Sequence, residues 1–225
     1  MAKVLGMGNA LVDIMTNLED DQILERFNLP KGSMQLVDHA FSNTVNEGTK
    51  HLKKQIASGG SAANSIHGLA RLGIETGFIG KVGQDEFGDF FKTDMENVGI
   101  RPMLLSGSSA TGKAIALISP DSERTIATFL GAAVELSAND ISHEQFDGYD
   151  YFHIEGYLVQ NHALIEKAVR LAKQKGLKIS LDMASYNVVE ENLEFLGMIL
   201  REFVDIVFAN EEEAKAFAGA EPEEA

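Results

Sequence analysis

The chain has 225 residues, a formal net charge of −15, 44% hydrophobic and 24% charged residues. This composition is typical of a soluble globular protein with one large α/β domain or two smaller ones. The absence of cysteine excludes disulfides, thiolate zinc sites and thiol nucleophiles. There is no apolar stretch of about 18 residues to span a membrane, no signal peptide pattern, and no cluster of lysine and arginine to bind nucleic acid. We therefore expect a cytoplasmic protein.

The first predicted element is a strand over roughly residues 3–14, from the apolar run KVLGMGNALVDIM. A helix is expected over residues 61–72, with Gly73 as its stop. A hairpin is expected from KAIALIS and RTIATFL, which the turn PDSE separates. Elsewhere strands and helices alternate. The expected strands are 75–82, 149–155, 177–183 and 204–210, and the expected helices are 85–99, 161–176, 192–203 and one from 211.

This alternation predicts an α/β fold with a mostly parallel sheet and right-handed crossovers. Ligands of such sheets bind beyond the carboxyl ends of the strands. Two stretches, approximately 14–50 and 101–130, interrupt the alternation. We expect them to form a β-rich lid at one edge of the sheet.

Two glycine-rich stretches imitate nucleotide-binding motifs. GMGNAL begins like a dinucleotide-binding loop, but Leu11 stands where the third glycine belongs and no helix start follows. GSSATGK fits the start of a P-loop, but Ala114 replaces the required serine or threonine and a strand is expected next. Neither stretch is interpreted as a nucleotide site, and His67 is interpreted as structural.

Four features fall at expected strand ends. Asp13 is a carboxylate in an apolar context and can accept hydrogen bonds from a sugar diol; a salt bridge in the lid is the alternative. The pair Gly59–Gly60 precedes a helix with Ser61 and Asn64 on its first turns. This pair either admits a ligand to the backbone or simply starts the helix.

The other two features concern phosphate and metal. Arg124, in the expected hairpin, is a candidate for phosphate contact, with an ordinary surface arginine as the alternative. Asn210 and Glu213 have the spacing of a helix capping box. The same two side chains are also candidates to organise Mg²⁺ and its waters near a phosphate.

The segments GNALVDI, SGGSAANSIHGLARLGIETGFIGKVGQDEFG, TGKAIALI and VFANEEEA together resemble the PfkB, or ribokinase-like, carbohydrate and nucleoside kinases. The resemblance runs over all 225 residues in the right order. It implies a three-layer α/β sandwich, with helices on both faces of the sheet and a small β-rich lid. It also implies transfer of the γ-phosphoryl group of ATP, with Mg²⁺, to a primary hydroxyl of a small-molecule sugar or nucleoside. Lids of this family often pair across a dimer, so the resemblance makes a homodimer through the lid one option, and the sequence leaves the oligomeric state open.

The resemblance also implies roles for individual residues. Arg124 would contact the transferring phosphate, while Asn210 and Glu213 would serve the metal, Asn210 through water, and the phosphates. Leu11 and Tyr157 resemble the apolar wall and stacking aromatic of adenosine kinases, although Leu11 suits the core and Tyr157 suits solvent equally well. The residues implied to bind substrate are Leu11, Asp13, Gly59, Gly60, Ser61, Asn64 and Tyr157.

The family's D-T-x-G-A-G-D segment, which carries the catalytic base, does not occur in these 225 residues. We therefore interpret residues 1–225 as the N-terminal part of a ribokinase-like domain. The base and the adenine-binding residues are expected beyond residue 225, so this chain alone is expected to be inactive. The alternative is a non-catalytic sugar or nucleoside binder derived from a kinase.

Overall fold

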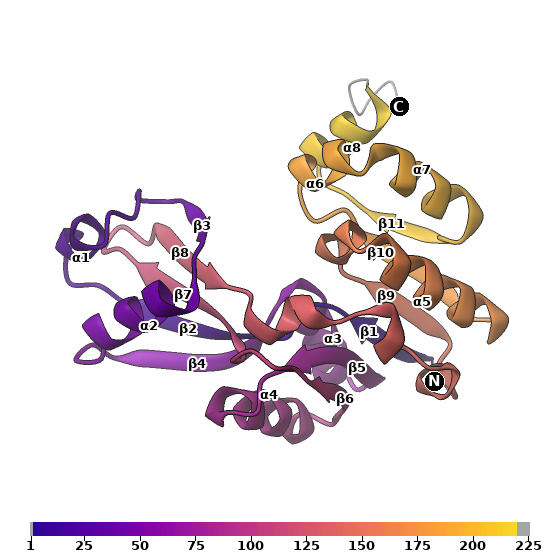
Figure 1. Ribbon diagram of the computed structural model, residues 1–225, viewed down its shortest axis with the longest axis horizontal. Helices are drawn as coiled ribbons and strands as arrows, with labels where there is room; N and C mark the ends of the chain where they lie inside the picture. Colours follow the sequence, from indigo (N-terminus) through magenta and orange to yellow (C-terminus); the bar gives the residue numbers. More distant parts are fainter. Residues whose placement is uncertain (1, 220–225) are drawn as a thin grey trace.

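The computed structural model describes residues 2–219 as two units joined side by side, a main α/β unit and a lid (Figure 1). The main unit contains a six-stranded sheet in the order β11-β10-β9-β1-β5-β6, and every neighbouring pair of strands is parallel. Its strands are β1 (Lys3–Met7), β5 (Glu75–Val82), β6 (Ile100–Ser106), β9 (Tyr151–Ile154), β10 (Lys178–Asp182) and β11 (Ile206–Phe208).

The order of these strands reverses at β1. The chain starts in the centre of the sheet, proceeds to β5 and β6 on one side, and returns to β9, β10 and β11 on the other. In open parallel sheets such a reversal leaves a crevice at the carboxyl ends of the strands, where ligands bind. Residues 8–10, after β1, and residues 155–157, after β9, lie at that crevice.

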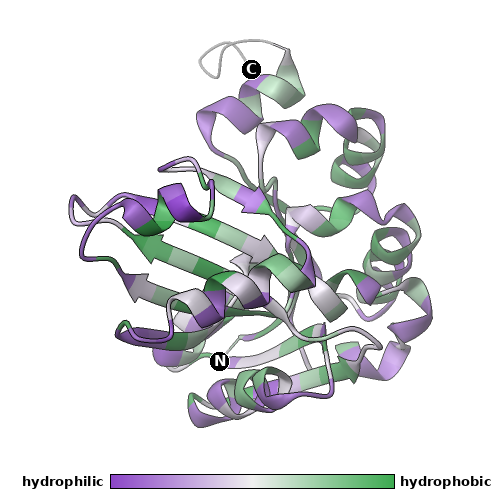
Figure 2. Ribbon diagram, turned by 60° about the vertical axis from the view of Figure 1, so that its left-hand side comes forward, coloured by the Kyte–Doolittle hydropathy of each residue, from purple (hydrophilic) through white to green (hydrophobic). Residues whose placement is uncertain are grey.

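Helices cover both faces of the main sheet. The helices are α3 (Ser61–Arg71), α4 (Glu86–Asn97), α5 (His162–Gln174), α6 (Tyr186–Glu191), α7 (Leu193–Glu202) and α8 (Glu211–Ala218). The side chains of α5, α6 and α7 pack with one face of the sheet in a single buried cluster, and α3 and α4 pack with the other face near β1 and β5. Figure 2 shows the expected alternation of hydrophobic and hydrophilic residues along these outer helices. The α/β fold with a mostly parallel sheet and helices on both faces is confirmed.

The lid is a five-stranded sheet in the order β3-β8-β7-β2-β4, covered by α1 (Gln22–Arg26) and α2 (His39–Gly48) (Figure 1). Its strands are β2 (Leu11–Asn17), β3 (Met34–Leu36), β4 (Lys54–Gly59), β7 (Gly112–Ile118) and β8 (Arg124–Phe129). The expected hairpin is confirmed, because β7 and β8 pair antiparallel. Four chain segments cross between the lid and the main unit, before β2, after β4, before β7 and after β8.

Three expectations about this region differ from the structure in detail. The single strand over residues 3–14 is two strands in different sheets, because Gly8, Asn9 and Ala10 carry the chain out of the main sheet. β6 belongs to the main sheet, so the second lid strand segment starts at Gly112 rather than near 101. The first lid segment is also longer than expected, because β4 reaches Gly59, and it is partly helical.

Within residues 2–219, the search for helices long and apolar enough to cross a bilayer finds none. The two nucleotide-motif imitations are also resolved as predicted. The stretch GSSATGK is followed by strand β7, and its Lys113 is buried with Nζ donating to Asn43 Oδ1 at 2.7 Å. The stretch GMGNAL leads into strand β2.

Candidate functional site

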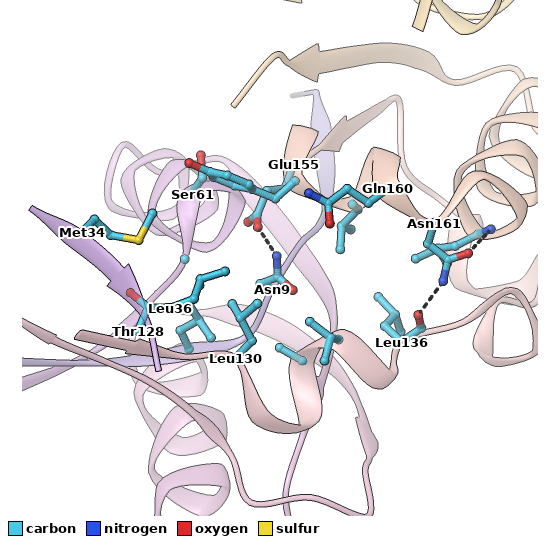
Figure 3. A pocket seen from close by; sticks show the side chains of 17 residues that line it. Asn9, Met34, Leu36, Ser61, Thr128, Leu130, Leu136, Glu155, Gln160 and Asn161 are labelled. Carbon is cyan, nitrogen blue, oxygen red and sulfur yellow. Dashed lines mark hydrogen bonds between the residues drawn. The ribbon is translucent and has the colours of Figure 1, made fainter. Parts of the chain in front are cut away.

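A cavity of about 400 Å³ lies between the lid and the carboxyl ends of the main strands (Figure 3). Most of its walls are apolar, and its few polar side chains are spread among them, with Asn9 and Glu155 near the middle (Figure 3). The apolar wall residues are Leu11, Met34, Leu36, Leu130, Ala133, Val134, Leu136, Leu158 and Leu164; the other lining residues are Asn9, Gly60, Ser61, Thr128, Glu155, Tyr157, Gln160 and Asn161. This size and composition are typical of a site for a small organic molecule with a few polar groups.

Asn9 and Glu155, two polar residues of the cavity wall, lie on the loops at the switch point of the main sheet. The Asn9 amide donates to Glu155 Oε1 at 2.6 Å, while Asn9 Oδ1 is buried and has no hydrogen-bond partner in the structure (Figure 3). An unpaired buried amide oxygen is costly, so it is a natural acceptor for a ligand hydroxyl. Glu155 is 2% exposed, and burial raises the pKa of its carboxyl.

Asp13 lies on the open face of the lid sheet, in the middle of β2. None of its contacts with the described residues is a hydrogen bond or an ion pair, so the alternative of a lid salt bridge is not observed. Burial raises the pKa of this carboxyl to about 6. A carboxylate held in this way gains from any ligand hydroxyl that donates to it.

The two glycines before α3 have separate structural reasons. At Gly59, a Cβ atom would overlap the Asp13 carboxyl group, which lies directly against its Cα. Gly60 has φ of +107°, and a Cβ there would overlap the backbone oxygen of Asn9. The pair is therefore more than a helix start, because it makes room for the acidic side chain and for the neighbouring chain crossing.

Ser61 and Asn64, expected together at the site, face different spaces. Ser61 lines the cavity, and its hydroxyl donates to Asp182 Oδ2 at 2.9 Å. Asn64 is exposed and lines a separate hollow of about 640 Å³ over the open side of β9–β11, together with His153 and Asp182. The structure thus brings Ser61 to the cavity, and the contact of Asn64 with substrate stays a prediction.

Leu11 and Tyr157 both line the cavity. Leu11 is 8% exposed, so it belongs to the core and to the cavity wall at once, whereas Tyr157 remains 36% exposed. Their predicted positions beside a ligand are compatible with the structure. The stacking of Tyr157 on a purine stays a prediction.

Arg124 is not brought to the cavity. It is exposed at the start of β8, opposite Ile118, whereas the cavity begins at Thr128. Four residues of extended strand separate the two positions by about 13 Å. In this structure it is a surface residue of the lid's outer end, and its contact with a transferring phosphate stays a prediction.

Asn210 and Glu213 form a complete capping box at the start of α8. Asn210 Oδ1 accepts from Glu213 N at 2.9 Å, and the two Glu213 oxygens accept from Asn210 N and Nδ2 at 3.0 and 2.8 Å. The capping alternative is therefore confirmed. A search of residues 2–219 for three or more clustered His, Asp or Glu side chains that could hold a metal finds none. We assign no step to Mg²⁺ at this pair, and its role toward metal and phosphate stays a prediction.

Glu155, Asn9 and Asp182 were missed by the sequence reasoning. Glu155 directly follows the apolar strand YFHI, and Asp182 ends the apolar strand KISL. A carboxylate at the carboxyl end of a buried parallel strand is the signal that could have identified both. His67 lies on α3 with Nε2 3.9 Å from Asp94 Oδ2, and its structural role stays a prediction.

A parallel α/β unit with a separate lid sheet, and a cavity between them at the strand ends, is an arrangement typical of proteins that enclose a small molecule. The chain belongs to the pfkB family of carbohydrate kinases, whose family model matches residues 34–225. The resemblance seen in the sequence is thereby confirmed.

Individual relatives agree with this assignment. The chain is 27% identical to an adenosine kinase of Schizophyllum commune, over 97% of the chain and 65% of the relative. It is 26% identical to a guanosine-inosine kinase of Escherichia coli, over 97% of the chain and 53% of the relative. The crystal structure of adenosine kinase from Sinorhizobium meliloti superposes with a TM-score of 0.82 at 32% identity, over 97% of this chain and 68% of that one. The chain thus spans between about half and two thirds of these relatives.

Proposed function

We propose that the protein transfers the γ-phosphoryl group of ATP to the primary hydroxyl of a nucleoside. The observation that carries the proposal is Asp13, a carboxylate with no hydrogen-bond or ion-pair partner among the described residues. It lies on the open face of the lid, two residues along β2 from Leu11, which lines the apolar cavity, and is not itself one of the lining residues. Two neighbouring hydroxyls of a ribose match the two oxygens of such a carboxylate. The relatives named as nucleoside kinases support the choice of substrate class.

The apolar cavity walls favour a nucleoside over a free sugar. Met34 and Leu36 from β3 face Leu136 and Leu158 from the main unit across the cavity. A free sugar has no apolar surface large enough to cover these walls, whereas a purine base does. Asn9 Oδ1 supplies a further acceptor on the sugar side of the cavity.

The chain's own residues contribute by positioning and by excluding water. Phosphoryl transfer depends mainly on alignment of the acceptor hydroxyl and on stabilisation of charge. Asp13 and Asn9 would fix the ribose, and the lid would cover it. ATP supplies the phosphoryl group, and Mg²⁺ would neutralise its phosphates; both are proposed from the family.

The proposal is tested in two steps. First, isothermal titration of the 225-residue chain with adenosine, inosine, guanosine, ribose and fructose measures acceptor binding, and a nucleoside is expected to bind at least tenfold more tightly than either sugar, from about 1.4 kcal/mol of base burial. Tighter binding of a free sugar would contradict the nucleoside assignment. Second, a polypeptide that contains these 225 residues together with a G-A-G-D segment is incubated with radiolabelled ATP and the nucleoside. Transfer of the labelled phosphoryl group to the nucleoside is expected. Nucleoside binding without transfer there would support the non-catalytic alternative.

Assembly is a separate expectation. β3 and β4 are the edge strands of the lid sheet, and Ile56 on β4 is 46% exposed. Edge strands of this kind can pair with a second copy. The predicted homodimer through the lid is tested by light scattering of the wild type and of Ile56→Lys, which should be monomeric if β4 forms the contact.

A further inference from the structure

Two of the four chain crossings between the lid and the main unit lie against each other. The first consists of residues 8–10, between β1 and β2, and the second runs from Gly60 to Ala62, from the end of β4 into the first turn of α3. Gly60 has no Cβ, and one would overlap the Asn9 carbonyl oxygen. The two crossings therefore form one backbone-to-backbone hinge, which we call the paired hinge.

A single main-sheet side chain reaches both halves of the paired hinge. Glu155 Oε1 accepts from the Asn9 side chain at 2.6 Å, and Glu155 Oε2 accepts from Ala62 N, on the first turn of α3, at 3.2 Å. The Glu155 backbone is itself fixed, because its N–H donates to the Met7 oxygen of β1 at 3.0 Å. One carboxylate thus connects the end of β9 to both chain segments that enter the lid.

The surroundings of Glu155 suit this connecting role. Its carboxylate passes over Gly8, where a Cβ would lie 2.5 Å from Oε2, and over the small side chain of Ala62. The side chain is 2% exposed, and each of its oxygens already accepts one hydrogen bond from the hinge. Glu155 lines the cavity together with Asn9 and Ser61, the first residue of α3, and its two hydrogen bonds hold these two segments in place around a bound ligand.

We propose that Glu155 is a positioning residue that fastens both crossings of the paired hinge to the main sheet. It thereby fixes the position of the lid's acceptor-binding groups relative to those of the main unit. The structural half of this inference stands alone, and the half that concerns acceptor binding rests on the proposed function. The crossing before β7 is fastened by two different acids, one of which, Glu135, lies on the segment that follows β8. Glu135 accepts from the Ser109 backbone N–H, and Asp85 accepts from the Thr111 N–H, each at 2.8 Å.

Two conservative variants of Glu155 separate the effect of side-chain length from the effect of its negative charge. Glu155→Asp keeps the charge but is one methylene too short to meet both donors. Glu155→Gln keeps the reach without the charge: its amide oxygen accepts from Ala62 N, and its amide nitrogen donates to Asn9 Oδ1 once that amide rotates, an oxygen that has no partner at present. Asp205→Ala is the matched control, because it removes an acceptor for a main-sheet amide, Ile179 N at 2.7 Å, away from the hinge.

The experiment is native-state hydrogen exchange of the Ala62 amide, combined with titration of the nucleoside identified above. In Glu155→Asp we expect exchange at Ala62 to be about tenfold faster and the affinity about tenfold lower, whereas Glu155→Gln should stay within about twofold of wild type in both. The control should change neither.

Three results would overturn the proposal. Unchanged Ala62 exchange in Glu155→Asp would show that the side chain fastens nothing. Loss of affinity in Glu155→Gln with normal exchange would show that the charge meets the ligand directly. Faster exchange of the Ala62 amide in Glu155→Gln would show that a side chain of this length does not fasten the segment without the negative charge. If Glu155→Asp does not fold, the behaviour of Glu155→Gln decides alone. Should the wild type bind no nucleoside, the proposed function fails, while the exchange measurement still tests the fastening.

Discussion

Both faces of the central strands of the main sheet are covered by helices, whereas only one face of the lid sheet is covered. In the main sheet Leu5, Phe78 and Ile79 are all 0% exposed. In the lid, Ile115 on the helix-covered face is 0% exposed, but Met34 and Leu36 on β3 are 53% and 66% exposed. The main sheet therefore uses its apolar residues for stability, while the open lid face keeps apolar side chains and the carboxyl of Asp13 available to a ligand.

The largest expected effect tests this division directly. Phe152 is fully buried and packs edge to face on Phe146 with ring centroids 5.1 Å apart. Phe152→Ala should lower the free energy of unfolding by about 3–5 kcal/mol through lost burial and a cavity. Leu36→Ala on the lid should change it by less than about 0.5 kcal/mol. Urea denaturation measures both; similar losses would mean that the open lid face is structural.

Asp13→Asn should have the opposite profile. It removes a carboxylate that has no hydrogen-bond or ion-pair partner among residues 2–219, so the free energy of unfolding at neutral pH should not fall. Nucleoside affinity should fall by about 10- to 100-fold, from loss of roughly 1.5–3 kcal/mol of charge-assisted hydrogen bonding. Calorimetric titration gives the affinity. An unchanged affinity in a folded variant would remove Asp13 from the site.

The raised pKa of Asp13 predicts that stability and nucleoside affinity change with pH in opposite directions. Burial raises this pKa from 3.8 to about 6, so the folded state holds the proton more tightly than the unfolded chain. The contribution of Asp13 to stability is therefore present at low pH and is lost as the pH rises from about 4 to about 6. Nucleoside binding, which needs the ionised form, should instead weaken about tenfold between pH 7 and pH 5. Both slopes should disappear in Asp13→Asn, and a wild-type slope in that variant would assign them to another group.

Alanine substitutions at Gly59 and Gly68 compare the contact with Asp13 in the lid with an exposed position on α3. A Cβ at Gly59 displaces the Asp13 carboxyl, so Gly59→Ala should lower nucleoside affinity by roughly tenfold. Gly68, within α3, has no atom near its Cβ direction, and Gly68→Ala should stabilise the protein by roughly 0.5–1 kcal/mol without changing affinity. Equal affinities of the two variants would show that Asp13 can move without consequence.

The smallest effect is expected at the far edge of the main sheet. Asn210→Ala removes the capping box of α8 and should cost about 1 kcal/mol of unfolding free energy. It should leave nucleoside affinity unchanged, because Asn210 lies outside the cavity. A fall in affinity of the 225-residue chain would place this pair closer to the acceptor than the structure does.

Local patterns in the sequence were sufficient to predict most elements of the main unit. Strand β5 was predicted with its observed bounds, and helix α3 ends before Gly73, which has φ of +84°. Residues 3–14 were predicted as one strand, because both halves of this stretch are apolar. Only tertiary structure shows that the halves enter different sheets.

The candidate site was predicted less completely for the same reason. Asp13 and the glycine pair were identified, but their contact depends on pairing of β2 with β4, and the strand KQIASG has too weak an alternation to be predicted. Arg124 lies outside the cavity because its place along β8 follows from the register with β7, which a single sequence does not reveal. Glu155 was missed because its partners are about 90 and 150 residues away in sequence.

The connectivity of the lid also constrains the order in which the protein can fold. β2 pairs with β7, and Leu11 lies opposite Gly112. During synthesis β2 leaves the ribosome roughly a hundred residues before its parallel neighbour, at a rate of about 5–20 residues per second. Pairings of such high sequence separation form slowly. The sheet that carries Asp13 must therefore remain incomplete for several seconds, during which β2 has β4 available on one edge and its other edge unpaired.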